Sequence, residues 1–465
     1  MGTSQHVSLD AGQLDGLAAI LGGRNVFVTG GAGTGKSTLL AHAVRDLAAR
    51  GRSVLVCAPT GVAALNVGGM TIHSLFGFVA AGPLVADEYE PTEAVREADV
   101  VIVDEISMVR RDLMDAMAAE LRAAALWRST DEGGRRKPAQ FVAFGDFAQL
   151  PPVLPSGKGV PGLRELRMLK DRYGTARRAD MYAFMADGWR DLGLADQSSW
   201  IRLERVIRQQ DPEFAHACNL LRLGDVRGAD WINAHATIGE DSFDRGAVTL
   251  VGRRAEAACI NAERLGELPG ATHIYTARFE EVGGGEEDER TQEWVDAVRA
   301  DPRQWPCDRT LGLKVGALVM CLANDVAAGY ANGTLGTVTS LGEASVTVRL
   351  ESGMEVEVGE MAWPIYSFWP SRLPDGKTKV GRHVVARIHG IPLRLAAAVT
   401  IHKSQGSTIS RMNLVPASWD PGQLYVALSR AEDVSGLHIA SPISRAMTEG
   451  SAPSSQVRAL LGASV

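Results

Sequence analysis

The chain lacks the cysteine patterns that mark structural metal sites and disulfide frameworks. Its five cysteines are scattered without any CxxC spacing, at Cys57, Cys218, Cys259, Cys307 and Cys321. This distribution predicts neither a zinc site nor an iron–sulfur cluster, and it fits a reducing compartment. The N-terminus has no basic segment followed by an apolar core, and no apolar run approaches the roughly 20 residues that span a bilayer. We therefore expect a cytoplasmic protein that does not bind membranes.

An excess of basic residues is also missing. The chain has 48 Lys and Arg against 55 Asp and Glu, which gives a net charge of −7. Residues 278–301 contain nine acidic and three basic residues, and they account for most of this charge. Because the remainder is nearly neutral, the global charge does not exclude a nucleic acid held in a local groove.

Length and hydrophobic pattern predict an α/β protein with more than one domain. A chain of 465 residues with 45% hydrophobic residues is too long for a single core. Four apolar runs in the first 155 residues end in polar or glycine-rich loops: NVFVTG, SVLVCAPT, ADVVIVDE and FVAFGD. Such runs are typical of buried parallel strands. After the first, Leu40, Val44 and Leu47 share one face of a predicted helix.

A second α/β unit is expected from about residue 200. Its strand candidates are 247–252, 316–322, 398–402, 412–417 and 436–440. Residues 333–358 differ, because their apolar residues alternate on both sides of a Ser-Gly turn, as in an antiparallel sheet. The expected bounds are 1–198 for the first domain, 199–331 with 392–465 for the second, and 332–391 for a small β insertion.

One basic stretch has no strand-like run. Residues 156–180 contain seven basic and three acidic residues. A solvated surface is the interpretation that we favour for it, and a surface insertion beside a polyanion is the alternative.

The segment GGAGTGKST at 30–38 matches the pattern G-x-x-x-x-G-K-[ST] and falls between a predicted strand and a predicted helix. Glycines there let backbone N–H groups surround phosphates, while Lys36 would reach the β and γ phosphates and Ser37 would bind Mg²⁺. The pattern predicts ATP and Mg²⁺ as ligands. The predicted nucleotide contacts are Gly30, Gly31, Ala32, Gly33, Thr34, Gly35, Lys36, Ser37 and Thr38.

The ends of two later strands add groups for hydrolysis. Asp104 and Glu105 end the run VVIVDE. In such enzymes the first carboxylate holds Mg²⁺ and the second polarises the attacking water, whereas the alternative is a cap of the strand end. Gln149, in FGDFAQLPPV, could sense the γ-phosphate, although a plain strand-to-loop turn explains this segment equally well.

Seven motifs in this order resemble the PIF-type (petite integration frequency) family of superfamily 1 DNA helicases, in its RecD-like 5′-to-3′ branch. They are VFVTGGAGTGKST, CAPTGVAALNVGGMTIHSLFGF, VIVDEISMV, GDFAQLPPV, VIRQQD, TIHKSQGST and YVALSRA, and they run to about residue 440. The resemblance implies two tandem RecA-like P-loop NTPase-type domains with an SH3-like barrel as the β insertion. It also implies a strand-separating insertion at 75–98. The family's Gly-Gly pair before GDFAQLPPV is replaced here by Pro138, Ala139 and Gln140.

Further residue roles follow from the resemblance alone. Gln13 would read adenine, and Arg208 and Arg430 would reach the γ-phosphate as arginine fingers, which are worth about 10³ to 10⁵ in rate. The segments implied to touch single-stranded DNA contribute Thr60, Gly61, Ala63, Ala64, His73 and Ser74 from the first domain, and Thr400, His402, Lys403, Ser404 and Gln405 from the second. Phe76 is a candidate for base stacking, although aromatics at alternate positions, here Phe76 and Phe78, more often belong to a core.

The resemblance implies an ATP-dependent DNA helicase that moves 5′ to 3′ on single-stranded DNA and unwinds forked or tailed duplexes. The alternative is a DNA-stimulated ATPase that remodels protein–DNA complexes without separating strands. A nucleotide switch with a vestigial ATPase is a third possibility, which the intact phosphate-binding and acidic motifs disfavour. We expect a monomer in solution, and the sequence names no protein partner.

Overall fold

The computed structural model describes residues 9–78, 91–131, 138–155, 159–209, 211–282, 295–296, 298–300, 305–323, 325, 328–330, 332–372 and 378–462. Within this described part, no helix is both long enough and apolar enough to cross a membrane. The candidate strand-separating insertion at 75–98 falls largely on residues 79–90, which lie outside it.

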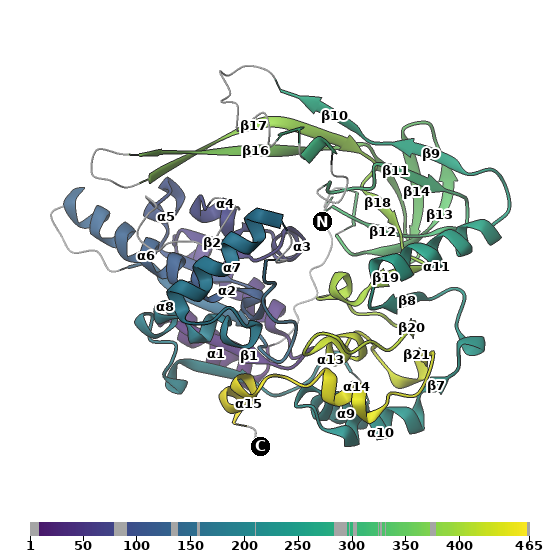
Figure 1. The fold of residues 1–465 in the computed structure, drawn as a ribbon, viewed down its shortest axis with the longest axis horizontal. Coiled ribbons are helices and arrows are strands. Elements are labelled where there is room, and N and C mark those ends of the chain that lie inside the picture. The colour runs from purple at the N-terminus through teal and green to yellow at the C-terminus, as the bar shows by residue number, and fades with distance from the viewer. Residues whose placement is uncertain are drawn as a thin grey trace.

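A six-stranded parallel sheet in the order β3-β2-β4-β5-β1-β6 forms the first domain (Figure 1). Its strands are β1 (Val26–Gly30), β2 (Val54–Ala58), β3 (Met70–Thr71), β4 (Val100–Val103), β5 (Gln140–Gly145) and β6 (Trp200–Leu203). Its helices are α1 (Ala11–Leu21), α2 (Lys36–Ala49), α3 (Gly61–Asn66), α4 (Ile72–Phe76), α5 (Glu93–Glu97), α6 (Arg111–Asp131), α7 (Gly159–Tyr173) and α8 (Asp187–Asp191).

Apolar side chains on both faces of β1 explain its central place in this sheet. Val26 and Val28 pack with residues of α1 and α2, whereas Phe27 points to the opposite face and packs with residues of α6 and α8. All five residues of β1 are buried. A strand with helices on both faces needs such a continuous apolar run, which is what the sequence predicted.

A five-stranded parallel sheet in the order β19-β8-β20-β21-β7 forms the second domain. Its strands are β7 (Thr237–Ile238), β8 (Val248–Val251), β19 (Ala398–Thr400), β20 (Met412–Leu414) and β21 (Leu437–Ile439). The helices are α9 (Pro212–Arg222), α10 (Val226–His235), α11 (Arg254–Glu267), α13 (Gln423–Leu428) and α14 (Arg445–Gly450). The last helix, α15 (Ser455–Leu461), was expected in the second domain but packs on the first, where Val457 is buried in the core. The 3-10 helix η7 (Ile401–Ser404) follows β19 directly.

An antiparallel insertion interrupts the second domain between α11 and β19. Its main sheet has the order β15-β14-β13-β12-β18, with β15 and β18 at the edges. The strands are β9 (His273–Thr276), β10 (Arg278–Glu281), β11 (Thr310–Leu313), β12 (Leu318–Cys321), β13 (Leu335–Leu341), β14 (Ser345–Leu350), β15 (Glu355–Gly359), β16 (Met361–Arg372), β17 (Thr378–Gly390) and β18 (Leu393–Leu395). The predicted alternation is confirmed, since Val346 pairs with Val358 and Val348 with Val356, and all four are buried.

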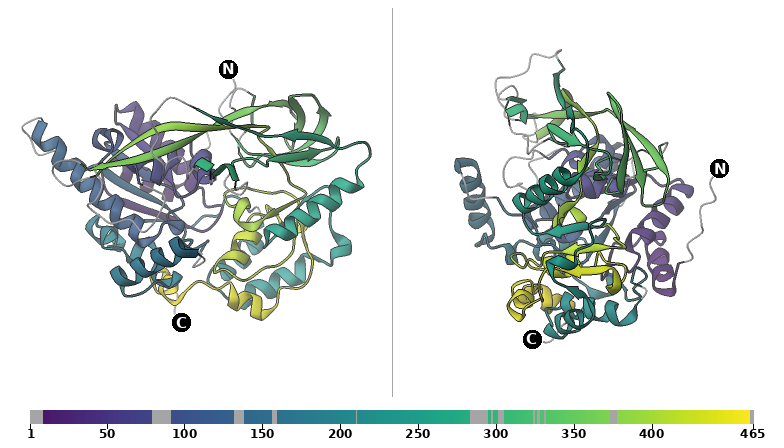
Figure 2. Two further views of the ribbon diagram at one scale, coloured as in Figure 1. Left: turned by 45° about the horizontal axis from the view of Figure 1, so that its top comes forward. Right: turned by 90° about the vertical axis from the view of Figure 1, so that its right-hand side faces the viewer.

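The longest strands, β16 and β17, form an antiparallel hairpin that also pairs with β10. Figures 1 and 2 show this hairpin leaving the insertion and extending over the first domain, above α4 and α5. The insertion thus spans both motor domains from one side.

One expected strand assignment and one expected domain boundary were wrong. The candidate at 316–322 contains β12, which pairs antiparallel with β13 and β18 and so belongs to the insertion. The proposed first-domain limit at residue 198 also precedes β6, which pairs with β1 and is the sixth strand of the first sheet. An apolar run of four residues is compatible with either kind of sheet, so only its hydrogen-bonded neighbours decide its place.

Candidate ATP and nucleic-acid sites

The P-loop connects β1 to α2 and lies against the second domain. Gly33 and Gly35 have positive φ angles of 76° and 80°. A Cβ atom at Gly33 would lie 2.5 Å from the Cβ of Arg208, so this turn and its close contact both require glycine. Lys36 Nζ donates hydrogen bonds to the carbonyl oxygens of Gly30 and Gly31 at 2.7 and 2.8 Å. The ammonium group is therefore held within the loop that the sequence predicts to bind phosphate.

The threonines of the loop differ in their surroundings. Thr34 is buried, and its hydroxyl donates to the carbonyl of Gly31 at 2.9 Å, which closes the turn from within. Thr38 is partly exposed in the first turn of α2, and Ser37 beside it is exposed. The side chain of Thr34 therefore shapes the loop, and the hydroxyls of Ser37 and Thr38 remain accessible to a ligand.

Buried charge surrounds Lys36. Burial lowers the pKa of its ammonium group, and the carboxylates of Asp146, Glu105 and Asp104 act in the opposite direction. One cation therefore lies among three acidic groups from two strand ends. This arrangement suits a site that must balance a metal ion against several phosphate charges.

Asp104 and Glu105 follow β4, and the pKa of each carboxyl is raised. Burial, and then the neighbouring Glu105, raise the pKa of Asp104 to about 7. Burial also raises the pKa of Glu105, against the opposing effects of Lys36 and Arg430. Glu105 has a φ of 51°, the positive φ that side chains rarely adopt, and among the described non-glycine residues it alone does so. The backbone thus holds this carboxyl in an unfavourable conformation at the strand end.

The donor set around Asp104 fits a magnesium ion bound with a nucleotide. Among the described residues, no three acidic, His or Cys side chains cluster as a complete metal site. Magnesium commonly takes one or two protein oxygens and completes its octahedron with waters and substrate phosphates. The exposed hydroxyl of Ser37 and the carboxylate of Asp104 are the groups that would hold it here.

Two arginines lie close together near the P-loop: Arg208, which follows β6, and Arg430, which follows α13. Arg208 Nη1 donates to the carbonyl of Ser429 at 2.9 Å, and Arg430 Nε donates to the carbonyl of Val426 at 2.8 Å. Neither forms an ion pair with a carboxylate of the described residues. Burial, and then the charge of Arg208, lower the pKa of Arg430 to about 9. One buried and one partly buried cation, adjacent and hydrogen-bonded only to neutral groups, form a site that an anion would stabilise.

Gln405 lies on the nucleotide side of the interface between the domains. Its Nε2 donates to Glu105 Oε2 at 3.0 Å and to Gln149 Oε1 at 3.4 Å. These hydrogen bonds place the side chain at the nucleotide site, and its predicted contact with DNA stays a prediction. The three side chains come from the ends of β4, β5 and β19, and only the packing of the two domains brings them together.

A buried ion pair that the sequence did not reveal connects the domains. Arg222, at the end of α9, donates two hydrogen bonds to Asp146 at 2.8 and 2.9 Å. The hydroxyl of Tyr425 lies 3.4 Å from the same carboxylate and accepts a hydrogen bond of 2.6 Å from the backbone N–H of Ala32. Asp146 lies within the quoted motif GDFAQLPPV, but no spacing or composition marked Arg222 as its partner.

Gln13 lies directly beside the P-loop, in α1. Its Oε1 accepts from the backbone N–H of Asp10 at 2.9 Å, and its Nε2 donates to the carbonyl of Gly35 at 3.3 Å. The side chain thus caps the helix and braces the phosphate loop. Its predicted contact with adenine stays a prediction.

The first-domain segment implied to touch DNA follows β2 and contains α3 and α4. Gly61 is exposed, and a Cβ atom there would meet nothing within 4 Å. Thr60 Oγ1 accepts from the N–H of Ala63 at 3.2 Å, so it begins α3. His73 and Ser74 are partly buried in α4, and burial lowers the pKa of His73. The open backbone around Gly61 is the part of this segment that a phosphate could approach closely.

Two residues of the same segment face inward. Phe76 is 1% exposed and stacks on Phe78, with ring centroids 5.4 Å apart, inside the first-domain core. Ala64 is 3% exposed. The base-stacking role considered for Phe76 is therefore wrong in this structure, because neither face of its ring reaches solvent. The core interpretation of the alternate aromatics is the correct one.

In the second domain, η7 presents some of its side chains and buries others. His402 is exposed and Lys403 partly so, whereas Thr400 is 8% exposed and Ser404 is fully buried. Ser404 Oγ donates to the carbonyl of Ile401 at 2.8 Å, which closes the turn. The predicted DNA contact by the Ser404 side chain is thus wrong, because its hydroxyl is enclosed and already bonded.

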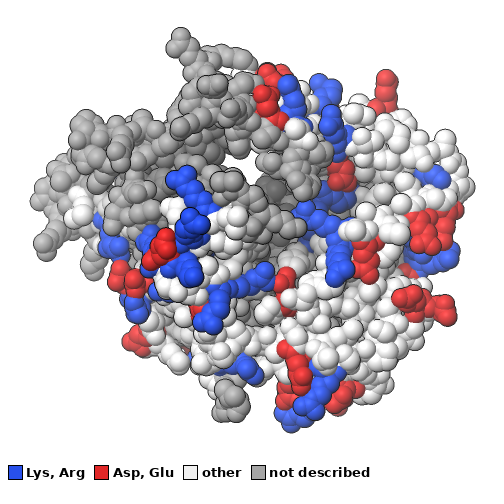
Figure 3. Space-filling model, in the orientation of Figure 1, with Lys and Arg blue, Asp and Glu red and all other residues white. Residues whose placement is uncertain are grey.

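Other cations that the sequence did not single out surround Lys403. Burial, and then the charges of Arg394 and Arg254, lower the pKa of Lys403 to about 8, against the carboxylate of Asp308. Positive charge is therefore concentrated at this end of the second sheet. Figure 3 shows Lys and Arg side chains gathered beside a hollow at the centre of this face of the molecule.

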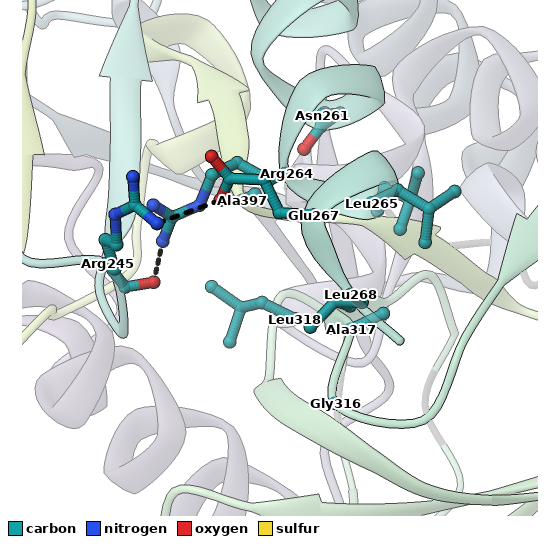
Figure 4. Close-up of a pocket in the computed structure, with 11 residues that line it drawn as sticks. Arg245, Asn261, Arg264, Leu265, Glu267, Leu268, Gly316, Ala317, Leu318 and Ala397 are labelled. Carbon is teal, nitrogen blue, oxygen red and sulfur yellow. Dashed lines mark hydrogen bonds and ion pairs between the residues drawn. The ribbon is translucent and has the colours of Figure 1, made fainter. Parts of the chain in front are cut away.

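A cavity of about 280 Å³ lies apart from both sites, between α11 and the antiparallel insertion (Figure 4). Arg245, Arg264 and Glu267 line one side of it, with leucine side chains opposite. The arginines already have partners, because Arg245 pairs with Glu267 at 3.3 Å and Arg264 donates to the carbonyl of Arg245. We assign no ligand to this cavity.

Comparison with known proteins relates the whole chain to one family. The family model described as PIF1-like helicase matches residues 14–164, and the one described as DNA helicase Pif1, 2B domain, matches residues 303–341. The chain is 31% identical over 445 residues to the ATP-dependent DNA helicase Pif1 of Bdellovibrio bacteriovorus, covering 93% of this chain and 88% of the relative. It is 32% identical over 440 residues to the ATP-dependent DNA helicase PIF1 of Homo sapiens, covering 91% of this chain but 59% of the relative.

Comparison with solved structures relates the chain to the same family. The Pif1 helicase from Bacteroides in complex with ADP-AlF3 and ssDNA superimposes with a TM-score of 0.66 at 30% identity, and the match covers 95% of this chain and 94% of that one. The likeness thus extends over nearly the whole chain and includes the tandem RecA-like domains. The chain belongs to the PIF1-like family of superfamily 1 helicases, and it is an ATP-dependent DNA helicase.

Proposed function

We propose that ATP is hydrolysed between the two RecA-like domains and that each cycle moves the protein 5′ to 3′ along single-stranded DNA, so that duplex ahead of it is unwound. One observation carries the mechanism most strongly. Arg430 is buried beside the partly buried Arg208, both lie near the P-loop, and neither forms an ion pair with a carboxylate of the described residues. A γ-phosphate would supply the missing negative charge to both domains at once.

In this proposal Glu105 holds the attacking water and accepts its proton. Burial raises its pKa, which increases its basicity, and it lies close to the cations of Lys36 and Arg430 beside the P-loop. Gln149 and Gln405, which both contact the region of this carboxylate, would orient the water or the γ-phosphate. A magnesium ion at Ser37 and Asp104 would neutralise phosphate charge.

Coupling to DNA would pass through η7. Lys403 lies in the positive region of the second domain, while Gln405, two residues further, touches the catalytic carboxylate. Loss of the γ-phosphate would release Arg208 and Arg430, and the two domains would then separate. Thr60, Gly61 and His73 in the first domain and His402 and Lys403 in the second would hold the strand alternately. Phosphate contacts of this kind position DNA without reading its sequence.

Unwinding of DNA duplexes that carry a single-stranded tail at either the 5′ or the 3′ end tests the proposal. Unwinding of a duplex with a 5′ single-stranded tail should depend on ATP and Mg²⁺, and a duplex with a 3′ tail should be unwound far more slowly. Equal unwinding of both tails would refute the polarity. Stimulation of ATP hydrolysis by DNA without any strand separation would favour the alternative, a translocase that remodels protein–DNA complexes.

The remaining expectations belong to the same proposal. We propose a cytoplasmic protein that acts as a monomer on forked or tailed DNA, with the first domain in 1–198 extended to the end of β6 at Leu203 and the insertion begun at β9. Sedimentation with and without DNA would test the monomer, and a dimer in the absence of DNA would overturn it.

A further inference from the structure

Most of the basic stretch left open by the sequence forms one well-anchored helix, α7, whereas Arg177 and Arg178 follow it and pair with Asp180 and Asp420. Three contacts fix one side of α7 to the first domain. Glu165 pairs with Arg110 at 2.8 Å, Leu169 is fully buried, and the hydroxyl of Tyr173 donates to Asp115 at 2.8 Å. Because Glu165 points inward and is used in this anchor, it does not neutralise the cations of the outer face.

The outer face of α7 carries Arg164, Arg167 and Lys170, all exposed. None of the three forms an ion pair with a residue that the structure describes. Asp171, also exposed at the end of the helix, is not paired with them either. Solvated helix faces usually mix charges of both signs in i,i+4 pairs, so three exposed and unpaired cations in two turns favour a polyanionic partner over a plain solvated surface.

The position and spacing of this stripe fit DNA. A helix rises about 1.5 Å per residue, so the three cations extend over about 9 Å, the axial length of two to three phosphates along one strand of B-DNA. In Figure 1, α7 lies on the first domain beneath the β16–β17 hairpin, and Figure 3, in the same orientation, shows basic side chains there beside the central hollow. The positive region around Lys403 lies in the second domain.

The side chains of α7 suit duplex DNA better than a single strand. Proteins that hold single strands combine basic grooves with aromatic rings on which bases stack. The aromatic ring of the described part of α7 belongs to Tyr173, and the guanidinium groups of Arg111 and Arg172 lie 4.4 and 5.3 Å from its centroid. The exposed large apolar residues, Leu163 and Met168, offer no ring. A face with cations and no accessible ring grips phosphates without stacking.

We propose that Arg164, Arg167 and Lys170 of α7 bind the phosphate backbone of the duplex arm at the junction where the strands separate. This inference rests on the proposed DNA helicase function and adds a separate duplex contact to the single-strand path. Such a contact would hold the duplex against the first domain while the two domains step along the tail.

The test uses the triple variant Arg164→Gln, Arg167→Gln and Lys170→Gln with two DNA probes, a 5′-tailed duplex and the single strand of the tail alone. Neutralising three phosphate contacts reduces the slope of log K against log salt by about 0.9 per contact. We expect the slope for the tailed duplex to fall by about 2 to 3 and its affinity by about tenfold near physiological salt. Affinity for the single strand should stay within about twofold.

A control variant removes the same charge elsewhere. Arg45, Arg50 and Arg52 are exposed or partly exposed near the end of α2 and before β2, at the edge of the first sheet opposite the carboxyl ends of its strands. Their replacement by Gln should leave both slopes unchanged. Should the α7 triple variant unfold, Arg167→Gln alone should still reduce the duplex slope by about 0.9.

The outcomes separate this proposal from the general function. An unchanged duplex slope in the α7 variant would overturn it, and so would an equal loss of affinity for the single strand, which would place α7 on the single-strand path. Failure of the unaltered protein to bind the single strand would instead contradict the proposed helicase function itself.

Discussion

Glu105 combines a positive φ, partial burial and a raised pKa at the end of β4. Replacement by Gln keeps its shape and removes its basicity. We expect Glu105→Gln to lower DNA-stimulated ATP turnover by about 10²- to 10⁴-fold, the usual contribution of a general base, with little change in nucleotide or DNA affinity. Phosphate release measured beside equilibrium binding would test this. Glu97→Gln, an exposed residue of α5, is the matched control, and wild-type turnover in Glu105→Gln would refute the assigned role.

Asp104 should make magnesium binding depend on pH. Its pKa is raised to about 7, so the carboxyl is protonated below that pH and ionised above it. Magnesium must then displace a proton at low pH, and the concentration for half-maximal turnover should rise up to about tenfold for each pH unit below about 7. Titrations with Mg²⁺ at about pH 6 and pH 8 would measure it. Asp104→Asn controls for titration of the nucleotide, and identical pH dependence in both proteins would contradict the prediction.

A substitution of Arg430 tests the proposed contact of the two arginines with the γ-phosphate. Arg430→Lys keeps one positive charge but loses the planar fork that can donate to two phosphate oxygens. We expect turnover to fall by about 10³-fold with ATP affinity reduced far less. Arg445, exposed in α14, offers a neutral comparison as Arg445→Lys. A variant of Arg430 that hydrolyses ATP at half the normal rate would exclude a transition-state role.

At the scale of a single element, η7 and the residue after it contact two different sites, the positive region of the second domain and the nucleotide site. Lys403 lies among other cations, while the amide of Gln405 contacts Glu105 and Gln149. Lys403→Ala should weaken single-strand affinity and reduce its salt slope by about 0.7, because single strands contribute less per phosphate than duplex does. Gln405→Ala should keep that affinity and lose most of the DNA stimulation of ATPase. Weaker DNA binding in Gln405→Ala would return this residue to the DNA site.

Other elements show how far sequence patterns predict position. β1, β2, β4 and β5 were predicted because a strand with helices on both faces leaves a long apolar run. The two-residue strands β3 and β7 carry no such pattern. Phe76 ends α4 and Phe78 follows two positions later, and no pattern in the sequence states which side of the chain meets the core. Their burial was decided by the packing of α4 on β2 and β3.

For the whole molecule, the arrangement of the domains depends on the pair between Asp146 and Arg222. Arg222→Met would leave a buried, uncompensated carboxylate, and breaking such a pair costs about 3 to 5 kcal/mol. The double variant Asp146→Asn with Arg222→Met should recover much of that loss, because it leaves no unpaired charge. Denaturant unfolding would measure both. Arg227→Met, which removes an exposed partner of Asp225, should change little, and equal stability of Arg222→Met and the unaltered protein would rule out this role.

The catalytic and phosphate-binding residues of the first domain could be predicted from the sequence, because they belong to local motifs. A P-loop, the acidic end of β4 and the order of seven motifs are local features, since each needs only a strand, a turn and the residues within it. For this reason Lys36, Ser37, Asp104 and Glu105 were predicted to meet, and the structure brings them together at the ends of β1 and β4, on either side of β5. The carboxyl ends of parallel strands share one edge of a sheet, so their residues converge without further information.

The contacts that residues of the second domain make with the first domain could be seen only in the tertiary structure. Gln405, expected on DNA, contacts Glu105, while Arg222 pairs with Asp146 across 76 positions of sequence. Both contacts arise where two separate sheets pack together, and no local pattern encodes the partner of a side chain across such an interface. The same holds for α7, whose basic composition was visible in the sequence. That Glu165 points inward and the cations outward follows from the anchor of Glu165 on Arg110.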